Sequence, residues 1–402
     1  MRSRNALAYL IGTLLSGFGD KVLFIAAGIW VRELTGSNAA SGLTFFFYIA
    51  PTMVIGPLAG LIVDRFPRRR VLIAANTLSA LSLLGLIGVH SASGLWRIYL
   101  VMVIYGALAT VGSAADVGLR TSVFDPEQFG SVNGLLSTVS EGLRLVVPLI
   151  GAGLFVLAGA MAVVGVDIAT YALAISLLLL IRVQEHHEAT SPQHWRAQAL
   201  AGVRHIFASP LQRRLTWALT VLLGTVGFFE TAMFAVATDG LRRSAAFVGV
   251  FVAFQGVGAI LGGVASASLM RRFGELKTAA LGMVAIALGS AIVLVGTQPH
   301  SLVAVLIVCG GIVLLGVGIT LLLVAVNTAI QRSTPRRLMG RVDAAFNVIF
   351  NGVQSISIAL GAGLVALVGF DIPILLIALS ALIGTVILGY RTPAMELESE
   401  VE

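Results

Sequence analysis

The chain has 402 residues, of which 57% are hydrophobic and 11% are charged, and its mean hydropathy is +0.98. Ordinary globular domains carry about 25% charged residues, so this composition excludes a soluble protein and indicates an integral membrane protein. The single cysteine, Cys309, excludes an internal disulfide, a Cys-x-x-Cys redox pair and a thiolate zinc cluster.

Twelve apolar stretches follow one another along the chain, each long enough for a membrane-spanning helix of about 20 residues. They cover residues 6–30, 41–63, 71–90, 98–120, 132–157, 161–182, 214–238, 245–269, 277–297, 301–330, 339–368 and 372–390. The first stretch has no evident cleavage site, so we expect it to be retained. The sequence therefore predicts an all-α integral membrane fold with 12 transmembrane helices.

The distribution of basic residues predicts the orientation of these helices. An even number of spans places both termini on one side, and 20 of the 26 Lys and Arg residues fall on that side, with four on the other. This asymmetry accounts for the net charge of +7 without a nucleic-acid partner. We expect a multi-pass protein of the cell inner (plasma) membrane with both termini cytoplasmic.

The longest polar interval, residues 183–213, divides the chain into two halves. We predict an N-terminal six-helix bundle (1–183), a cytoplasmic linker (184–213), a C-terminal six-helix bundle (214–391) and an acidic, disordered tail (392–402). Apolar residues of the linker share one helical face, which predicts an amphipathic helix on the inner leaflet; a solvated linker helix is the alternative. These apolar residues are Trp195, Ala199, Leu200, Val203, Ile206 and Phe207.

The two halves are related as pseudo-repeats. Arg65-Phe66-Pro67 after the second span corresponds to Arg272-Phe273-Gly274 after the eighth span, 207 residues later. Internal repeats around a midplane binding site are typical of transporters in which two bundles alternate about a shared cavity.

The loop after the second span contains a basic motif, Gly60-Leu61-Ile62-Val63-Asp64-Arg65-Phe66-Pro67-Arg68-Arg69-Arg70. The motif resembles the major facilitator superfamily signature G-x-x-x-D-[RK]-x-G-[RK]-[RK]-[RK], with Pro67 in place of the second glycine. The resemblance implies that Asp64 sits at the positive N-terminal end of a helix that begins near Gly340-Arg341-Val342-Asp343, while the arginines reach carboxylates and lipid headgroups. The resemblance implies a latch on the inner side; a merely topogenic basic loop is the alternative.

Other stretches are similar to the 12-helix drug-efflux branch of this superfamily, which includes macrolide exporters, multidrug pumps of the mycobacterial Tap type and enterobactin exporters. These stretches are Gly19-Asp20, Trp30-Val31, Leu34-Thr35-Gly36-Ser37, Leu119-Arg120-Thr121-Ser122, Gly202-Val203-Arg204-His205-Ile206 and Pro210-Leu211. The antiporter signature G-P-x-x-G-G appears here as Val147-Pro148-Leu149-Ile150-Gly151-Ala152, so two glycines are absent. This departure weakens the expectation of standard proton antiport but not that of the fold.

Ionisable residues inside the predicted spans are the best candidates for functional groups, because each costs at least about 2.5–3.5 kcal/mol at bilayer depth. A cavity carboxylate beside a mobile cation can load and release a proton near neutral pH. We therefore predict that Asp20 and Glu141 couple transport to protons, with Glu230 as a third candidate. Lys21 and Arg144 are their expected charge partners; static structural ion pairs are the alternative. Asp167 is a further carboxylate within the sixth span.

Asp116 and Arg120 are spaced i, i+4 at the inner end of the fourth span, the favourable order for a helical ion pair. In the family an acid here can engage the neighbouring arginines, so the resemblance couples Asp116 to Arg68 or Arg70; a plain surface pair is the alternative. The predicted cytoplasmic gate comprises Gly60, Asp64, Arg65, Arg68, Arg70, Asp116 and Arg120.

The expected substrate cavity lies between the halves. The predicted spans contain more carboxylates than cations, which favours a cationic or neutral amphiphile over an anion. The five carboxylates are Asp20, Asp116, Glu141, Asp167 and Glu230, and the two cations are Lys21 and Arg144. Aromatic residues concentrate on the first, second and seventh spans, where they can hold apolar or cationic compounds, although packing or lipid contact is the simpler role for each one. The cavity residues that we predict are Phe18, Phe24, Phe45 and Phe229.

The remaining glycine and histidine patterns indicate packing rather than chemistry. Gly56 with Gly60, and Gly258 with Gly262, are small-x-x-x-small pairs that favour close helix packing. No Walker-type motif and no His-x-x-x-His or H-E-x-x-H pattern is present, so we expect no ATP drive, no metal site and no cofactor.

The sequence therefore favours a monomeric secondary transporter, not an enzyme. We expect it to export small amphiphilic compounds such as drugs by alternating access, through proton antiport, within membrane lipid. An exporter of a defined metabolite, such as a siderophore or lysolipid, and an uncoupled facilitator are the alternatives.

Overall fold

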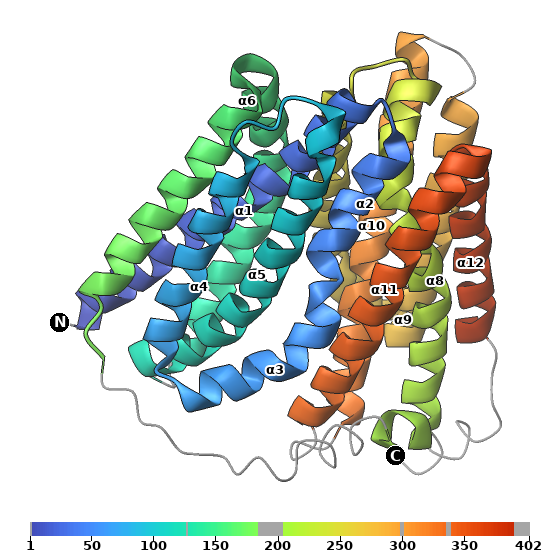
Figure 1. Cartoon of the computed structure of the whole chain (residues 1–402). Coiled ribbons are helices and arrows are strands. Elements are labelled where there is room, and N and C mark those ends of the chain that lie inside the picture. The colour runs from blue at the N-terminus through green and yellow to red at the C-terminus, as the bar shows by residue number, and fades with distance from the viewer. Residues whose placement is uncertain (1, 126–127, 184–203, 298–300, 335–338, 390–402) are drawn as a thin grey trace, which may run out of the picture.

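The computed structural model describes residues 2–125, 128–183, 204–297, 301–334 and 339–389, and the described part of the chain is helical without strands (Figure 1). The predicted acidic tail and most of the predicted linker helix lie outside these residues. The long helices are α1 (Arg2–Thr35), α2 (Asn38–Ile49), α3 (Pro51–Arg65), α4 (Arg68–Leu83), α5 (Leu95–Val123), α6 (Phe129–Leu180), α8 (Pro210–Ala235), α9 (Val248–Gly296), α10 (Leu302–Ser333), α11 (Met339–Val368) and α12 (Asp371–Gly389).

Within the described residues, ten helices are long and apolar enough to cross a membrane. Two of the long helices contain a turn. Gly159 in α6 has φ 77° and Gly274 in α9 has φ 78°, and only glycine adopts this left-handed conformation without a steric cost. The 52 residues of α6 and the 49 residues of α9 are each enough for two spans of about 20 residues. The all-α, twelve-span membrane fold is therefore confirmed.

The predicted second span, residues 41–63, is not one straight helix. The structure divides it into α2 and α3 at Ala50, directly before Pro51. Proline lacks a backbone N–H and its ring clashes with the preceding turn, which bends a helix. Figure 1 shows α3 lying across the lower end of the molecule rather than in line with α2. This bend places the basic motif at the edge of that end.

The helices form two groups. In the first, α1 packs on α6 and α4 packs on α5; in the second, α9 packs on α10 and α12, and α8 packs on α11. The groups meet where α2 contacts α8 and α11 and where α6 contacts α9. Elements from both groups therefore surround the centre of the molecule.

The glycine pairs predicted for close packing behave differently from one another. A Cβ on Gly258 would lie 1.9 Å from the Val313 carbonyl oxygen, and a Cβ on Gly262 would lie 2.7 Å from the Val317 carbonyl oxygen. Both glycines therefore allow α10 to pack closely against α9. A Cβ on Gly56 or Gly60 meets no atom of the described residues within 4 Å. The prediction of close packing is correct for the first pair and wrong for the second, which lies on α3 after the bend.

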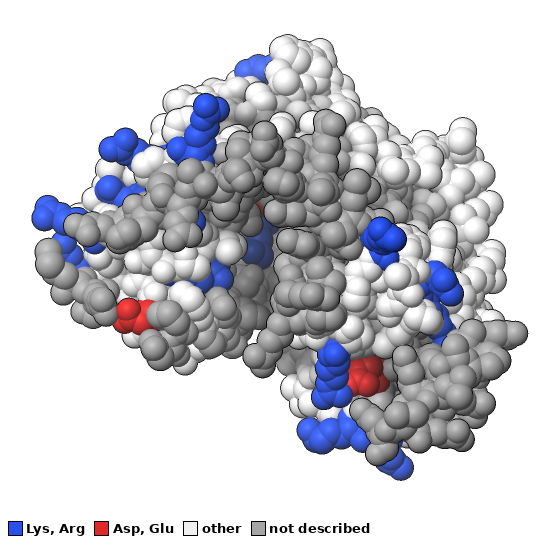
Figure 2. All heavy atoms as spheres, turned by 90° about the horizontal axis from the view of Figure 1, so that it is seen from below, with Lys and Arg blue, Asp and Glu red and all other residues white. Residues whose placement is uncertain are grey.

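The end of the molecule that carries α3 and the N-terminus, here called the basic face, is rich in Lys and Arg (Figure 2). Among the described residues drawn there, Asp and Glu are few, and the cytoplasmic orientation of this face stays a prediction. Exposed basic residues at helix ends and turns include Arg65, Arg70, Arg204, Arg213, Arg271 and Arg332.

Candidate functional site

A central cavity of about 390 Å³ lies where the two helix groups meet. It is lined from α1, α2 and α6 in the first group and from α8 and α9 in the second. The lining residues are Asp20, Lys21, Phe24, Ile25, Tyr48, Pro148, Phe229, Glu230, Met233, Val252 and Gln255. An aromatic and aliphatic wall with two carboxylates and one ammonium suits a small amphiphile.

The central cavity brings together five of the predicted functional residues: Asp20, Lys21, Phe24, Phe229 and Glu230. These residues come from α1 and α8, so their proximity depends on the association of the two helix groups.

Two predicted cavity residues, Phe45 and Phe18, are not among those that line the central cavity. Phe45 is fully buried and packs with ring centroids 4.5 Å from Phe24 and 5.9 Å from Phe234, which makes it part of the packing behind the cavity wall. Phe18 is half-buried against the hydrophobic core.

Asp20 belongs to a hydrogen-bonded group, here called the carboxyl cluster, formed by Asp20, Tyr105, Asp167 and Tyr171. The Tyr105 hydroxyl lies 2.7 Å from Asp20 Oδ1 and 2.8 Å from Asp167 Oδ2. The Tyr171 hydroxyl lies 2.6 Å from Asp20 Oδ1. Asp167 is fully buried, so its carboxyl group has no direct contact with solvent.

Gly19 allows α6 to bring Asp167 against α1. A Cβ at Gly19 would lie 2.2 Å from Thr170 Oγ1 and 2.3 Å from Asp167 Oδ1. Real side chains do not approach so closely, so no larger residue fits there without displacing Asp167. The sequence showed Asp167 as an intramembrane charge without a partner, and neither Tyr105 nor Tyr171 was identified from it.

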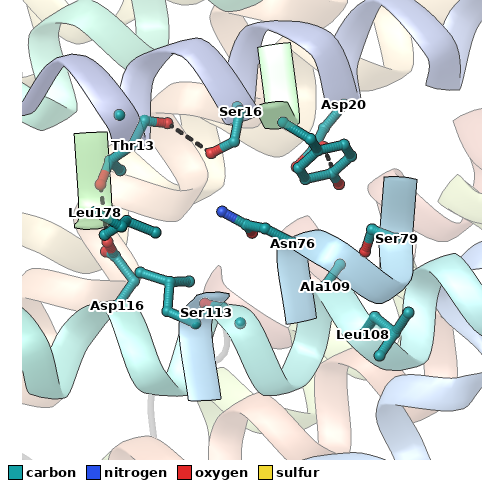
Figure 3. A pocket seen from close by; sticks show the side chains of 15 residues that line it. Thr13, Ser16, Asp20, Asn76, Ser79, Leu108, Ala109, Ser113, Asp116 and Leu178 are labelled. Atoms are coloured by element: carbon teal, nitrogen blue, oxygen red, sulfur yellow. Dashed lines mark hydrogen bonds between the residues drawn. The ribbon is translucent and has the colours of Figure 1, made fainter. Parts of the chain in front are cut away.

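A second, polar cavity of about 210 Å³ lies inside the first helix group and is here called the N-terminal cavity (Figure 3). Its walls come from α1, α4, α5 and α6. Polar residues on these walls are Thr13, Ser16, Asp20, Asn76, Ser79, Ser113, Asp116 and Tyr171. Figure 3 shows the Asn76 amide pointing into the space, with Asp20 and Asp116 towards opposite ends. Asp20 is the one described lining residue that this cavity shares with the central cavity.

The predicted ion pair of Asp116 and Arg120 is present, with Nη2 of Arg120 at 2.8 Å from Asp116 Oδ2. Thr13 donates to the other carboxylate oxygen at 2.9 Å, and Arg120 Nε donates to the Tyr9 hydroxyl at 3.0 Å. The Asp116 and Arg120 side chains are 15% and 22% exposed, so this end of the N-terminal cavity reaches solvent.

The arginines of the basic motif contact the ends of neighbouring helices. Arg68 Nη1 donates to the Gly118 carbonyl at 3.3 Å, and Arg69 donates to the carbonyls of Leu178 and Leu179 at 2.7 and 2.9 Å. Cations are favourable at helix C-terminal ends. Arg65 and Arg70 are exposed, Gly60 lies in α3, and the Asp64 side chain lies outside the described part.

Glu141 and Arg144 lie in α6, and their side chains are outside the described part of the structure. Their neighbours Ser140 and Leu143 line a cavity of about 430 Å³ together with Lys21 and Arg120. The predicted pairing and proton role of Glu141 stay predictions.

The two helix groups are joined at the far face, opposite the basic face, by a set of contacts that we call the far-face latch: Arg32, Asn38 and Asp239. Arg32 Nε donates to Asn38 Oδ1 at 2.7 Å, and Asn38 Nδ2 donates to Asp239 Oδ2 at 2.8 Å. Arg32 also lies 3.6 Å from Asp239 Oδ1. The latch links α1 and α2 of the first group to the π-helical turn Val236–Gly240 that follows α8 in the second.

Helix packing below the latch is equally tight. A Cβ at Gly42 on α2 would lie 1.8 Å from Thr231 Oγ1 on α8, and a Cβ at Gly249 on α9 would lie 2.7 Å from the Ala152 Cβ on α6. The molecule is therefore closed at its far face.

A family model for the Major Facilitator Superfamily matches residues 9–358. Among curated proteins, the lysophospholipid transporters LplT of Yersinia pestis (strain Pestoides F) and Yersinia pseudotuberculosis (serotype O:3, strain YPIII) are each 26% identical over 201 residues. The match covers 50% of this chain and 47% of each relative, so the chain spans about half the length of the curated relatives it matches.

Solved structures share the fold. A bacterial homologue of iron transporter ferroportin in the inward-facing state superposes with a TM-score of 0.77 at 16% identity, over 96% of this chain and 98% of that one. Its outward-facing state gives 0.63 at 19% identity, over 95% and 98%. The nucleoside transporter NupG gives 0.76 at 14% identity, over 95% and 98%.

Proposed function

Because the chain belongs to the Major Facilitator Superfamily and is a membrane transporter of that type, we propose that it exports small amphiphilic compounds in exchange for protons. The observation that carries this proposal is the central cavity, in which Asp20, Lys21 and Glu230 lie among Phe24, Phe229 and aliphatic side chains. The aromatic walls hold an apolar or cationic body, while the carboxylates hold positive charge or protons.

Alternating access supplies the transport step. The closed far face and the cavity between the groups support an arrangement in which substrate enters from the basic face, which we propose to be cytoplasmic. Opening the far face requires the separation of α2 from α8, and therefore the loss of the contacts of Asn38 with Asp239 and of Gly42 with Thr231.

The test uses purified protein in liposomes that contain a pH-sensitive dye, with ethidium, a macrolide, a siderophore and a lysophospholipid added in turn. We expect one of the amphiphiles to drive proton movement, and we expect Asp20→Asn to abolish it. Substrate flux without proton movement would contradict antiport and favour a facilitator. No flux of any of these compounds would contradict the proposed substrate class.

Transport of a lysophospholipid is the second candidate. It is favoured by the 26% identity to the lysophospholipid transporters over half of the chain, and Lys21 in the apolar cavity supplies a cation for a phosphate group. In the same assay, flux of the lysophospholipid without flux of ethidium or the macrolide would support this candidate over drug export.

A further inference from the structure

We propose that Asp20 and Asp167 hold one proton jointly through the Tyr105 hydroxyl, and that this proton exchanges with water through the N-terminal cavity rather than through the central cavity. The inference rests on the proposed function, since it names the groups that would carry the coupled proton.

The number of hydrogens in the carboxyl cluster requires this proton. Three short contacts join its four residues, between Tyr105 and each of the two carboxyl groups and between Tyr171 and Asp20, at 2.6–2.8 Å. Each contact needs one hydrogen, and the two phenols supply only two, because an ionised carboxylate is acceptor-only. The third hydrogen must therefore lie on a carboxyl group, Asp20 or Asp167.

Burial leads to the same conclusion. Two ionised carboxylates bridged by one hydroxyl inside a membrane would repel each other, and removing both charges from water is costly. Asp167 is fully buried, so it exchanges its proton through Tyr105 and Asp20. When the cluster releases its proton, one carboxyl O–H bond breaks and the proton passes to water. Both carboxyl groups are then ionised, Tyr105 donates to only one of them, and positive charge in the central cavity must offset the second negative charge.

The charges around the cluster are those that a coupling site needs. The titratable groups next to the four cluster residues are Lys21 on α1, Tyr48 on α2 and Glu230 on α8, while Asp116 on α5 lies at the opposite end of the N-terminal cavity. Lys21 and Glu230 line the central cavity with Asp20. A cationic substrate in the central cavity would therefore lie beside the same carboxyl group that holds the proton, which favours proton release on substrate binding.

The N-terminal cavity offers a path for that proton. Its volume of about 210 Å³ is enough for several water molecules. Asn76 and Ser79 are at least nine-tenths buried and line the cavity, and their side chains make no hydrogen bond with the described residues, so we expect water in the cavity to bind them. The path runs from Asp20 to the partly exposed pair of Asp116 and Arg120.

The experiment uses the full-length protein in liposomes with an interior pH dye and ethidium as the probe. In Asp167→Asn the amide still donates to the Tyr105 oxygen but cannot release its hydrogen. We expect proton movement per ethidium to fall at least about tenfold, as for loss of an acid–base group, while ethidium counterflow continues. Tyr105→Phe should give the same loss. Tyr99→Phe is the matched control, because Tyr99 lies on the same helix as Tyr105 but its hydroxyl donates to the Ala40 carbonyl of α2, outside the cluster.

The path is tested separately. Asn76→Leu replaces a buried amide by an apolar side chain of similar size, and we expect at least about a tenfold slower proton signal with ethidium counterflow intact. Thr77→Val on the same helix is the control, because Thr77 is exposed and bonds only within α4. Wild-type proton rates in Asn76→Leu would overturn the path, and wild-type coupling in both Asp167→Asn and Tyr105→Phe would overturn the shared proton.

An infrared measurement separates these failures from a failure of the proposed function. The wild-type protein should show the band of a buried protonated carboxyl group, which Asp167→Asn or Asp20→Asn removes and Tyr99→Phe retains. If the wild-type protein moves ethidium without protons but shows this band, the proposed antiport is refuted and the shared proton of the carboxyl cluster is retained. Absence of the band would refute the cluster whatever the transport result.

Discussion

Gly19 is the residue on which the carboxyl cluster depends most directly. In Gly19→Ala the new Cβ would lie 2.2 Å from Thr170 Oγ1 and 2.3 Å from Asp167 Oδ1, so Asp167 must move away from α1 and from Tyr105. Overpacking of this kind costs about 1–3 kcal/mol. We expect a lower melting temperature in detergent and loss of substrate-driven proton movement.

The control for this substitution is Gly165→Ala on α6, two residues before Asp167. A Cβ at Gly165 meets no atom of the described residues within 4 Å, so this variant should melt and transport as the wild type does. Equal stability and coupling of Gly19→Ala and the wild type would show that Asp167 does not need its close contact with α1.

At the residue scale, the sequence predicted the charges but not their partners. Apolar context alone marks Asp20 and Glu230 as costly intramembrane groups, and both line the central cavity. The link between Asp20 and Asp167 runs through a hydroxyl on a third helix, 85 residues from Asp20 in the chain. Helical periodicity shows which residues share a face, but it does not show which helix lies opposite that face.

At the scale of helices, the contact of α2 with α8 controls the far face. A Cβ at Gly42 would lie 1.8 Å from Thr231 Oγ1, so Gly42→Val should prevent closure while leaving each helix group intact. We expect a folded protein, held open at the far face, that no longer transports. Spin labels at the far ends of α2 and α8 should show longer distances than in the wild type.

Two features make this measurement selective. The single cysteine, Cys309, is buried, so introduced cysteines can be labelled without interference. Gly153→Val on α6 is the control, because a Cβ at Gly153 meets no atom of the described residues within 4 Å. Wild-type distances in Gly42→Val would contradict a role for this contact in closing the far face.

The far-face latch gives a milder test of the same movement. Asn38→Ala removes the acceptor for Arg32 Nε and for the Thr238 hydroxyl and the donor to Asp239. Of the latch contacts, the 3.6 Å ion pair between Arg32 and Asp239 remains. Exposed ion pairs contribute about 0–1 kcal/mol. We therefore expect a partial shift of the same spin-label distances towards the open form, which Arg32→Ala combined with Asn38→Ala should increase.

Helix positions were more predictable than helix directions. The sequence placed breaks between residues 157 and 161 and between 269 and 277, where Gly159 and Gly274 turn the chain. It missed the bend at Ala50, because an apolar run through Pro51 has the composition of one continuous span. A proline inside an apolar run is a signal for such a bend, although the run alone does not give its direction.

For the whole molecule, the carboxyl cluster predicts how many protons accompany each substrate. One exchangeable proton per cluster means one proton per ethidium cation, so the exchange carries no net charge. A difference of one pH unit supplies about 1.4 kcal/mol per proton, which corresponds to about tenfold accumulation of ethidium. Because substrate moves against the proton flow, ethidium should collect on the acidic side of the membrane, whichever way the protein is inserted.

The accumulation ratio at equilibrium tests this number in liposomes with a set pH difference and a membrane potential fixed by potassium and valinomycin. With one proton the ratio should be about tenfold per pH unit and independent of the potential. With two protons, as expected if Glu141 carries a second one, it would be about a hundredfold, and each 100 mV would add about 2.3 kcal/mol. A ratio that depends on the potential would therefore contradict a single shared proton, and in Asp167→Asn the pH difference should drive no accumulation.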